Sequence, residues 1–226
     1  MKIVFLEAQS IGDDIDLSGF DILGEVVKYP IATAEQTPEL IADADVAVLS
    51  KIPVNEATIG AAKNLKLVCL TATGTNNLDK DYLDSHGIAW RNVADYSTES
   101  VAQHTFAMLF YLLEKLSYYD NYVKSGRYVN DTSFSHFAEA FHELQGMTWG
   151  IIGLGNIGRR VASIAEAFGA HVIYCSPSGA QPQPGYSQVD FETLLSSSDI
   201  VSVHAPLNQY TERLMDEAAF RKMRPH

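Results

Sequence analysis

The residues GLGNIG at positions 153–158 form a G-x-G-x-x-G pattern, whose spacing suits the binding of a phosphate. The pattern directly follows an apolar, strand-like run at 149–152 and opens an amphipathic, helix-like stretch. In that setting Gly153 permits a tight turn, Gly155 lets the backbone approach a pyrophosphate, and Gly158 lets the helix pack closely on the strand. Free N–H groups at the helix start suit the anion. We therefore predict a dinucleotide-binding turn; the alternative is that these glycines serve folding alone.

The end of the next strand determines which dinucleotide is expected. Proteins that bind NAD usually carry Asp or Glu there, where the carboxylate binds the ribose 2′-hydroxyl. Here the run HVIYC is followed by Ser176 and Pro177, so no acid stands at that place. No Arg or Lys follows within the next several residues to meet a 2′-phosphate. We expect NAD as the coenzyme and keep NADP as the alternative.

Short β-branched runs alternate with helix-like stretches along the whole chain. Before residue 98 the strand-like runs are KIVFL, EVVKYP, DVAVLS, LKLVCLTATG and IAWRNV. After residue 146, strands MTWGIIGLG, HVIYCS and DIVSVHAPL alternate with helices NIGRRVASIAEAF, FETLLSS and TERLMDEAAFRKM. This rhythm predicts βαβ units and parallel sheets. We expect an α/β protein with domains at residues 1–97 and 98–226. In the first domain Thr37 is the predicted N-cap of a helix that has Pro38 at its first position.

Residues 98–125 contain neither Pro nor Gly, and Ser97 or Thr98 can cap their start, so one long helix is predicted. Its apolar residues cover more than one face. Such a helix packs between domains or against a second subunit, and we expect a homodimer through residues 98–125; the alternative is that the apolar stripe is core. The stretch 127–146 predicts an ordered loop, in which His136 and His142 lack the spacing of metal ligands.

Composition limits the classes of partner. Sixteen Lys and Arg against 28 Asp and Glu give a formal net charge of −12 at pH 7, and such a field repels nucleic acid. No run of about 18 apolar residues is present, so we expect no membrane span and a cytoplasmic protein. Cys69 and Cys175 lie in separate apolar runs, which favours burial over a disulfide or a metal site. The expected partners are small molecules.

Four segments together resemble D-isomer-specific 2-hydroxyacid dehydrogenases, most of all glycerate dehydrogenases (hydroxypyruvate reductases). They are TATGTNNLD, NVADYSTESVAQHTFAMLF, ELQGMTWGIIGLGNIGRRVA and SSSDIVSVHAPLNQYTERLMD, and the likeness runs through essentially all 226 residues. The resemblance implies a flavodoxin-like substrate domain followed by a Rossmann-type NAD(P)-binding domain. It also implies hydride transfer between NAD(P)H and a small 2-keto or 2-hydroxy acid.

The resemblance assigns roles to particular residues. It places substrate-carboxylate binding at Ala72, Thr73, Gly74 and Thr75, and we add Lys51 as a candidate from its place after a strand. A glycine-containing turn after a strand suits an anion. Besides the three glycines, the residues that the resemblance places at the coenzyme are Asn156, Ile157, Ser176, His204, Ala205, Pro206, Thr211 and Thr98. His204 belongs to the coenzyme-lining segment and is not the family's catalytic histidine.

The resemblance also implies catalytic residues that these 226 residues do not contain. Family members carry an arginine for the substrate, and a glutamate that tunes a proton-exchanging histidine, after the last segment matched here. We therefore expect a C-terminally truncated copy with no catalytic residues of its own and an incomplete second domain. The alternatives are a non-catalytic dinucleotide-binding or regulatory module and a decayed fragment.

Overall fold

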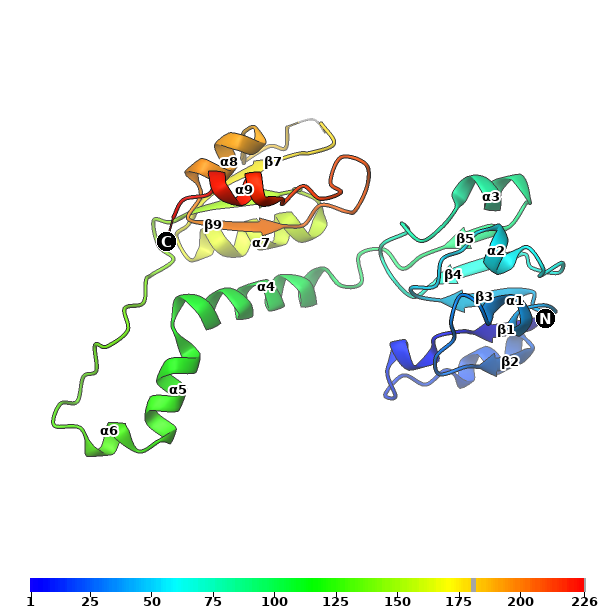
Figure 1. The fold of residues 1–226 in the computed structure, drawn as a ribbon, viewed down its shortest axis with the longest axis horizontal. Coiled ribbons are helices and arrows are strands. Elements are labelled where there is room, and N and C mark those ends of the chain that lie inside the picture. The colour runs from blue at the N-terminus through cyan, green and yellow to red at the C-terminus, as the bar shows by residue number, and fades with distance from the viewer. Residues whose placement is uncertain (180–181, 226) are drawn as a thin grey trace. The chain divides into compact units, whose positions relative to one another are not determined.

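Runs of β-branched and aliphatic residues form two parallel sheets in the chain. The computed structural model describes residues 1–179 and 182–225, which divide into two compact units, Met1–Tyr96 and Ser97–His226 (Figure 1). Each unit carries its own sheet and its own core, and each is described by itself. No helix in the described part of the chain is long and apolar enough to cross a membrane.

The first unit is a five-stranded sheet in the order β2-β1-β3-β4-β5, with all neighbours parallel. This is the flavodoxin-like order, in which the chain reverses direction across the sheet beside β1. Its strands are β1 (Lys2–Phe5), β2 (Glu25–Lys28), β3 (Val46–Leu49), β4 (Leu67–Leu70) and β5 (Ala89–Arg91). Its helices are η1 (Ala8–Ile11), η2 (Ser18–Leu23), α1 (Thr37–Leu40), α2 (Glu56–Ile59) and α3 (Lys80–Ser85).

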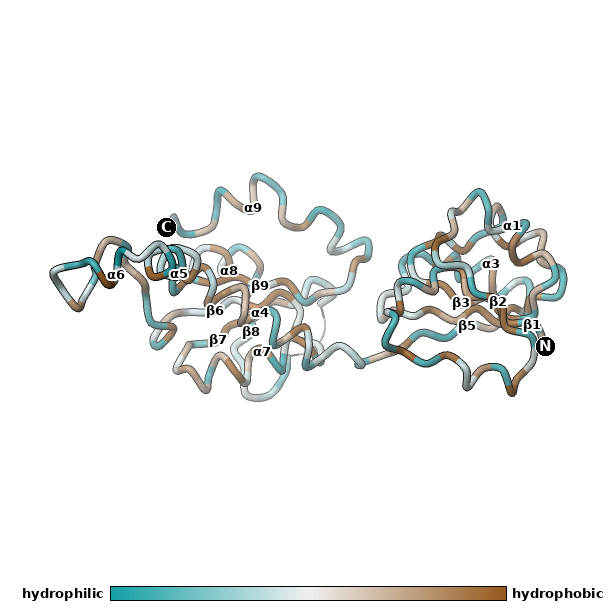
Figure 2. Tube along the Cα trace, turned by 90° about the horizontal axis from the view of Figure 1, so that it is seen from below, coloured by the Kyte–Doolittle hydropathy of each residue, from teal (hydrophilic) through white to brown (hydrophobic). Residues whose placement is uncertain are grey.

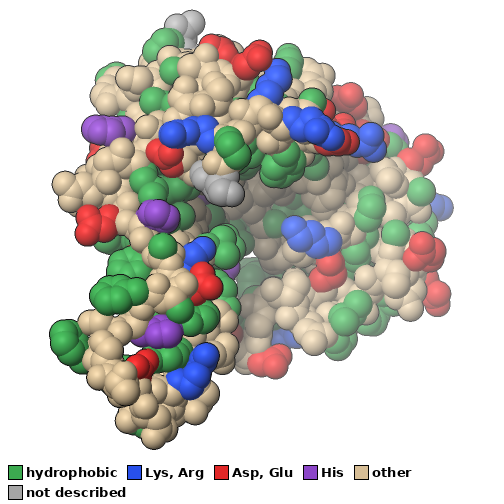
Figure 3. Space-filling model, turned by 60° about the vertical axis from the view of Figure 1, so that its left-hand side comes forward, with side chains coloured by type: hydrophobic (Ala, Val, Ile, Leu, Met, Phe, Trp, Pro, Cys, Tyr) green, Lys and Arg blue, Asp and Glu red, His purple; other side chains and the backbone are tan. Residues whose placement is uncertain are grey.

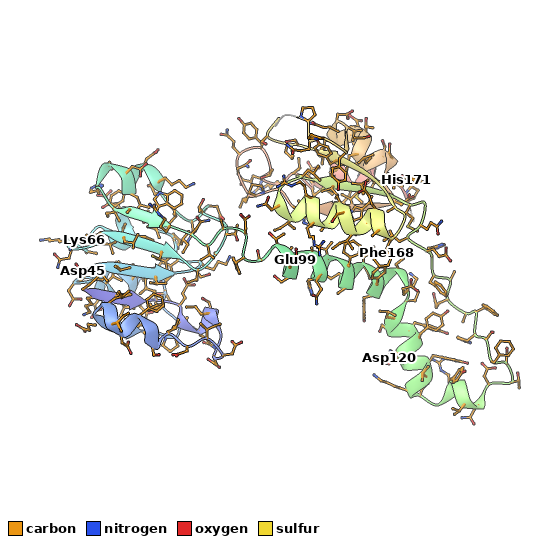
Figure 4. The ribbon with its side chains drawn as sticks, turned by 180° about the vertical axis from the view of Figure 1, so that it is seen from behind. Asp45, Lys66, Glu99, Asp120, Phe168 and His171 are labelled. Carbon is orange, nitrogen blue, oxygen red and sulfur yellow. The ribbon has the colours of Figure 1, made fainter. Side chains whose placement is uncertain are left out.

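The central strand β3 shows why the sequence folds this way. All four of its residues are buried, and they divide by alternation between the two faces of the sheet. Ala47 and Leu49 join the larger core, whereas Val46 and Val48 join a smaller cluster with Phe5. Figure 2 shows the hydrophobic residues of this unit concentrated along its strands. At the amino-terminal edge Asp45 accepts from Lys66 Nζ at 2.8 Å, with both residues labelled in Figure 4.

The start of α1 differs slightly from the prediction. Gln36 is the N-cap, and Thr37 is already helical, so Pro38 follows one position later than expected. Thr37 is fully buried, and its hydroxyl donates to the carbonyl oxygen of Thr33 at 2.8 Å. The threonine therefore stabilises the preceding turn instead of capping the helix.

The second unit is a four-stranded parallel sheet in the order β8-β7-β6-β9. This is the order 3-2-1-4 of a Rossmann-type fold, with the change of direction between β6 and β9. Its strands are β6 (Thr148–Ile152), β7 (His171–Cys175), β8 (Ser187–Gln188) and β9 (Ile200–Val203). Its helices are α4 (Thr98–Leu113), α5 (Leu116–Lys124), α6 (Arg127–Asn130), α7 (Asn156–Ala167), α8 (Phe191–Ser197) and α9 (Glu217–Lys222). The expected α/β class, with a flavodoxin-like and a Rossmann-type sheet, is confirmed.

The predicted single helix over residues 98–125 is wrong. The helix ends at Leu113, Lys115 adopts a left-handed conformation with φ 52°, and α5 leaves in a new direction (Figure 1). Neither Gly nor Pro marks the break in the sequence. His136, from the segment after α6, stacks on Tyr122 of α5 with ring centroids 3.8 Å apart, and its Nε2 lies 2.7 Å from the hydroxyl of Tyr118. These contacts hold α5 and the segment after α6 together, and they give His136 a packing role.

Helix α4 packs on α7 through an aromatic cluster. Ala102 and Phe106 are its buried residues, and the Phe106 ring lies 5.0 Å from Trp149 and 6.0 Å from Phe168. At the other end of the contact Glu99 accepts from Arg160 Nε at 2.9 Å. Glu99 and Phe168 are labelled in Figure 4. One face of α4 therefore belongs to the core of its own unit.

Two further differences from the prediction lie near the end of the chain. The helix expected over TERLMDEAAFRKM begins only at Glu217, with Asp216 as its cap, because residues 208–214 form turns in which Arg213 has φ 53°. Strand β8, only two residues long, was not predicted, since a run of that length leaves no alternation to read. Both differences affect the loops around the candidate site.

Candidate functional site

The turn between β6 and α7 contains two crowded glycines and one, Gly155, that faces open space. Gly153 has φ +92°, and a Cβ there would lie 2.7 Å from the amide nitrogen of Ala205. A Cβ on Gly158 would overlap the carbonyl oxygen of Gly153. By contrast, a Cβ on Gly155 would meet nothing within 4 Å. Two glycines are thus required for packing, whereas Gly155, the N-cap of α7, keeps the approach to the helix start clear.

The end of β9 forms the opposite wall of this turn. The amide of His204 donates to the carbonyl oxygen of Ile152 at 2.8 Å, and Gly153 donates to the carbonyl oxygen of Cys175 at 2.9 Å. These bonds bring the ends of β6, β7 and β9 together at the point where the strand order reverses, which is where open α/β sheets bind ligands. A cavity of about 250 Å³ lies there. Its lining consists of Gly153, Leu154, Gly155, Tyr174, Ser176, Pro177, Ser178, Gln183, His204, Ala205, Pro206, Asn208 and Thr211.

The structure brings together seven of the residues assigned to the coenzyme. Gly153, Gly155, Ser176, His204, Ala205, Pro206 and Thr211 all line the cavity. Asn156, Ile157 and Gly158 form the first turn of α7 next to it, whereas Thr98 begins α4 and does not line the cavity. Sequence reasoning did not assign Pro177, Ser178, Gln183 and Asn208 to the site, because only the folded loops after β7 and β9 bring them to this place.

His204 is held by a hydrogen-bonded chain from the core. Its Nε2 lies 3.0 Å from the hydroxyl of Ser202, which also accepts from Trp149 Nε1 at 2.8 Å. Trp149 is fully buried, so the chain runs from the centre of the unit to the cavity wall. Burial lowers the pKa of His204 below its usual 6.5, and the ring is therefore neutral at pH 7. A neutral imidazole beside a coenzyme can donate from one nitrogen and accept at the other.

A cation that the sequence pattern did not single out lies over the turn. Arg159 follows the last glycine, and its guanidinium donates to the carbonyl oxygen of Leu154 at 3.3 Å and to Oδ1 of Asn156. The side chain therefore folds back along the turn and is not directed away from it. An arginine in that place can supply charge-assisted hydrogen bonds to a phosphate.

Thr211 stabilises the loop after β9. Its hydroxyl donates to the carbonyl oxygen of Pro206 at 2.6 Å and accepts from the amide of Asn208 at 2.8 Å. On the opposite side, the hydroxyl of Tyr174 accepts from the amide of Gln183 at 2.7 Å and donates to Gln188 at 3.1 Å. The bonds of Thr211 stabilise the loop after β9, and the bonds of Tyr174 stabilise the segment after β7; both segments contribute lining residues to the cavity.

The residues assigned to the substrate carboxylate lie in the first unit, after two neighbouring strands. Lys51 follows β3 and is exposed, while Ala72, Thr73, Gly74 and Thr75 follow β4. The hydroxyl of Thr73 donates to the carbonyl oxygen of Val93 at 3.1 Å. Within the described ranges, the amides of Ala72, Thr73 and Gly74 donate no hydrogen bond, so this turn has N–H groups for an anion.

The amide of Lys51 is already engaged by a residue that the prediction did not include. The carboxylate of Glu7 accepts from the amides of Ser50 at 2.6 Å, Lys51 at 2.8 Å and Ile52 at 3.3 Å. This carboxylate occupies the backbone amides after β3, so only the side chain of Lys51 remains for a ligand. Across the described residues, no three His, Cys, Asp or Glu side chains gather to hold a metal ion.

A doubly wound unit with a G-x-G-x-x-G turn, an open helix start and a cavity at the strand reversal defines the class of dinucleotide-binding proteins. Comparison with known proteins narrows this class. Residues 106–226 match the NAD binding domain of D-isomer specific 2-hydroxyacid dehydrogenases. The chain therefore belongs to the D-isomer specific 2-hydroxyacid dehydrogenase family. Family members are NAD-dependent oxidoreductases that act on the CH–OH group of 2-hydroxyacids.

The relatives that match nearly the whole chain include a glycerate dehydrogenase and a hydroxypyruvate reductase. Glycerate dehydrogenase of Methylorubrum extorquens is 31% identical over 224 residues, which are 99% of this chain and 69% of the relative. Hydroxypyruvate reductase of Blautia hydrogenotrophica is 30% identical over 232 residues, which are 99% of this chain and 71% of the relative. The predicted likeness to this branch of the family is confirmed.

Solved structures agree over both units. An acyclic imino acid reductase in complex with NADPH and D-Arg matches with a TM-score of 0.85 and 26% identity, covering 99% of this chain and 71% of that chain. D-lactate dehydrogenase from Aquifex aeolicus, complexed with NAD and lactic acid, matches with a TM-score of 0.84 and 26% identity, covering 98% and 66%. The structural neighbours therefore include complexes with either dinucleotide.

Proposed function

We propose that this chain binds a nicotinamide dinucleotide with its pyrophosphate over the turn at Gly155. The observation that carries the proposal is the clear space at Gly155, between two glycines that packing requires. The bound coenzyme supplies or accepts the hydride, and the substrate is a small 2-keto or 2-hydroxy acid such as hydroxypyruvate or glycerate. The names of the two relatives at about 30% identity support that substrate class.

The residues of the second unit have distinct parts in this proposal. The amides at the start of α7, with Asn156 and Ile157, hold the pyrophosphate, and the guanidinium of Arg159 adds charge-assisted bonds. The loop with His204, Ala205, Pro206 and Thr211 lies along the coenzyme, and Ser176 lies at the adenosine ribose. Thr98 approaches the nicotinamide. The fit rests on the cavity and the open turn, both of which lie within this unit.

The first unit contributes the substrate contacts in this proposal. The amides of Ala72, Thr73 and Gly74 donate hydrogen bonds to the substrate carboxylate, and the side chain of Lys51 is a cationic candidate for the same group. Residues 1–97 then form the substrate domain and residues 98–226 the NAD(P)-binding domain. Support comes from the flavodoxin-like sheet order of the first unit. Because β3 and β4 are parallel neighbours, Lys51 and the turn after β4 follow strands that end at the same edge of the sheet.

The experiment that tests coenzyme binding is a titration of the chain with NADH, followed by coenzyme fluorescence. Gly155→Val should abolish binding, because the added side chain would fill the space that the pyrophosphate needs. Gly19→Val is the matched control: a Cβ there also meets nothing within 4 Å, and it lies far from the turn in the chain. Binding that survives in Gly155→Val would contradict the proposal, provided that circular dichroism shows both variants folded.

A second measurement separates an enzyme from a binding module. The resemblance assigns neither the substrate-binding arginine nor the proton-exchanging histidine and its glutamate to a residue among these 226. Stabilisation by NADH without oxidation of NADH by hydroxypyruvate would favour the non-catalytic or regulatory role, since a ligand that binds only the folded state raises its stability. Turnover of hydroxypyruvate would favour the enzyme.

For the assembly, we propose a cytoplasmic homodimer that forms through the free face of α4. The apolar side chains of Val101, Met108, Tyr111, Leu112 and Leu116 are exposed there or just beyond the end of the helix. Figure 3 shows further hydrophobic side chains exposed over the lower lobe that contains α5 and α6. Large exposed apolar patches mark interaction surfaces. Light scattering should give twice the monomer mass, and Leu112→Asp should return the mass of one chain.

A further inference from the structure

Among the described residues, no charged side chain lines the part of the cavity assigned to the adenosine ribose. Residues 176–188 read SPSGAQPQPGYSQ, with no Asp, Glu, Lys, Arg or His. Ser176, Ser178 and Gln183 from this stretch line the cavity. Such hydroxyl and amide groups can donate to a phosphate and can also accept from a ribose hydroxyl. The stretch therefore offers hydrogen bonds of both kinds and no charge of either sign.

The first carboxylate after this stretch in the chain belongs to a different cavity. Asp190 lines a neighbouring cavity of about 490 Å³, and it does not line the first. Both cavities are lined by Ser176 and Pro177, so these two residues separate them. The carboxylate of Asp190 caps α8: it accepts from the amide of Thr193 at 2.9 Å and from its hydroxyl at 2.6 Å. Asp190 therefore serves the helix start and is not positioned for a ribose hydroxyl in the first cavity.

Neither of the two usual devices for choosing a coenzyme is present at this place. An acid at the end of the second strand selects NAD because it binds the 2′-hydroxyl, whereas an arginine accommodates the 2′-phosphate of NADP. On the basis of the coenzyme site proposed above, we infer that this ribose end does not select by charge and that the chain binds NAD(H) and NADP(H) alike. Ser176 occupies the position where an Asp or Glu that selects NAD would stand.

The charge of Asp190 sets the expected difference between the dissociation constants of NADH and NADPH. Burial raises the pKa of the Cys175 thiol to about 11, and the charge of Asp190 adds to this effect as the smaller cause. Charge interactions near an exposed surface are worth about 0.2 to 1 kcal/mol, so the dissociation constants of NADH and NADPH should agree within about tenfold.

The test is a pair of titrations of the full 226-residue chain, one with NADH and one with NADPH, at low and at high salt. Ser176→Asp should weaken the binding of NADPH by about tenfold or more relative to that of NADH, because the new carboxylate would repel the 2′-phosphate. Ser178→Arg should change the ratio in the opposite direction. Both changes should shrink in high salt, since exposed charges are screened.

The outcomes separate the two proposals. Two dissociation constants within tenfold, with opposite shifts in the two variants, support the inference. A preference of the unmodified chain for one coenzyme by more than a hundredfold would overturn the inference and leave the proposed coenzyme site standing. If neither coenzyme binds, the proposed function fails, and the inference fails with it. Gly155→Val serves as the control, because it should lose both coenzymes equally.

Discussion

The hydroxyl of Ser202 lies 3.0 Å from Nε2 of His204, and this pair connects the wall of the cavity to the core. Trp149, fully buried on β6, donates to the same hydroxyl at 2.8 Å. The serine therefore fixes the orientation of an imidazole whose burial lowers its pKa. Because a protonated ring would be an uncompensated charge in a half-buried place, the chain should respond to acid at this residue.

The first prediction is a loss of stability in acid that depends on His204. The folded chain holds this ring neutral below the usual pKa of 6.5, whereas the unfolded chain binds the proton. The free energy of unfolding should therefore fall as the pH drops below about 6.5, with a slope from this one group of at most about 1.4 kcal/mol per pH unit. Urea unfolding at pH 7.5 and at pH 5.5 measures this change in the free energy of unfolding.

His204→Gln should remove that part of the slope, whereas His171→Gln, at an exposed position at the start of β7, should keep it. An unchanged slope in His204→Gln would show that the acid response comes from another group.

The second prediction separates the two kinds of glycine in the turn. Gly158→Ala should lower the free energy of unfolding by about 2 kcal/mol, because its Cβ would overlap the carbonyl oxygen of Gly153. Gly155→Ala should change stability by less than about 0.5 kcal/mol, because its Cβ meets open space. Gly155→Ala should nevertheless weaken the binding of NADH by about tenfold or more. Equal losses of stability in the two variants would contradict this account of the turn.

The third prediction concerns the tyrosine that ties α5 to the segment after α6. Tyr122 donates to the carboxylate of Asp131, which raises the pKa of Tyr122 to about 12. The hydrogen bond is therefore present below pH 10 and is lost as the pH rises through about 12. A spectrophotometric titration should show a tyrosine step near pH 12 that Tyr122→Phe removes. Tyr128→Phe, exposed on α6, is the control that should leave the late step in place.

The fourth prediction compares two phenylalanines of unequal burial. Phe106 is buried against Trp149 and Phe168, so Phe106→Ala should cost about 3 kcal/mol or more in the free energy of unfolding. Phe134 is 92% exposed, and Phe134→Ala should leave the stability of the monomer unchanged. Chemical denaturation of both variants checks the difference. A large loss in Phe134→Ala would mean that this side chain is covered in solution, as a dimer through this region would require.

The longer strands and the dinucleotide turn could be predicted because their signals are local. A short run of β-branched and aliphatic residues identifies β3, and the strand–turn–helix spacing identifies the turn at Gly155. The break at Lys115 could not be predicted, because the residues around it favour a helix, and the stacking of His136 on α5 joins residues far apart in the chain. The same holds for Glu7, whose carboxylate meets the amides after β3 from a distant part of the sequence. What the sequence leaves out, in each case, is a contact between residues far apart in the chain.

The last prediction concerns Arg159, which no motif singled out. Its guanidinium folds back over the turn onto the carbonyl oxygen of Leu154, next to the start of α7. Hydrogen bonds to charged groups contribute about 1.5 to 3 kcal/mol, so Arg159→Gln should weaken NADH by roughly tenfold or more. Arg160→Gln is the matched control, because the neighbouring arginine pairs with Glu99 on α4 instead. The loss in Arg159→Gln should shrink as salt rises. If both variants bind NADH as the unmodified chain does, Arg159 does not contact the pyrophosphate, and the amides of α7 hold it alone.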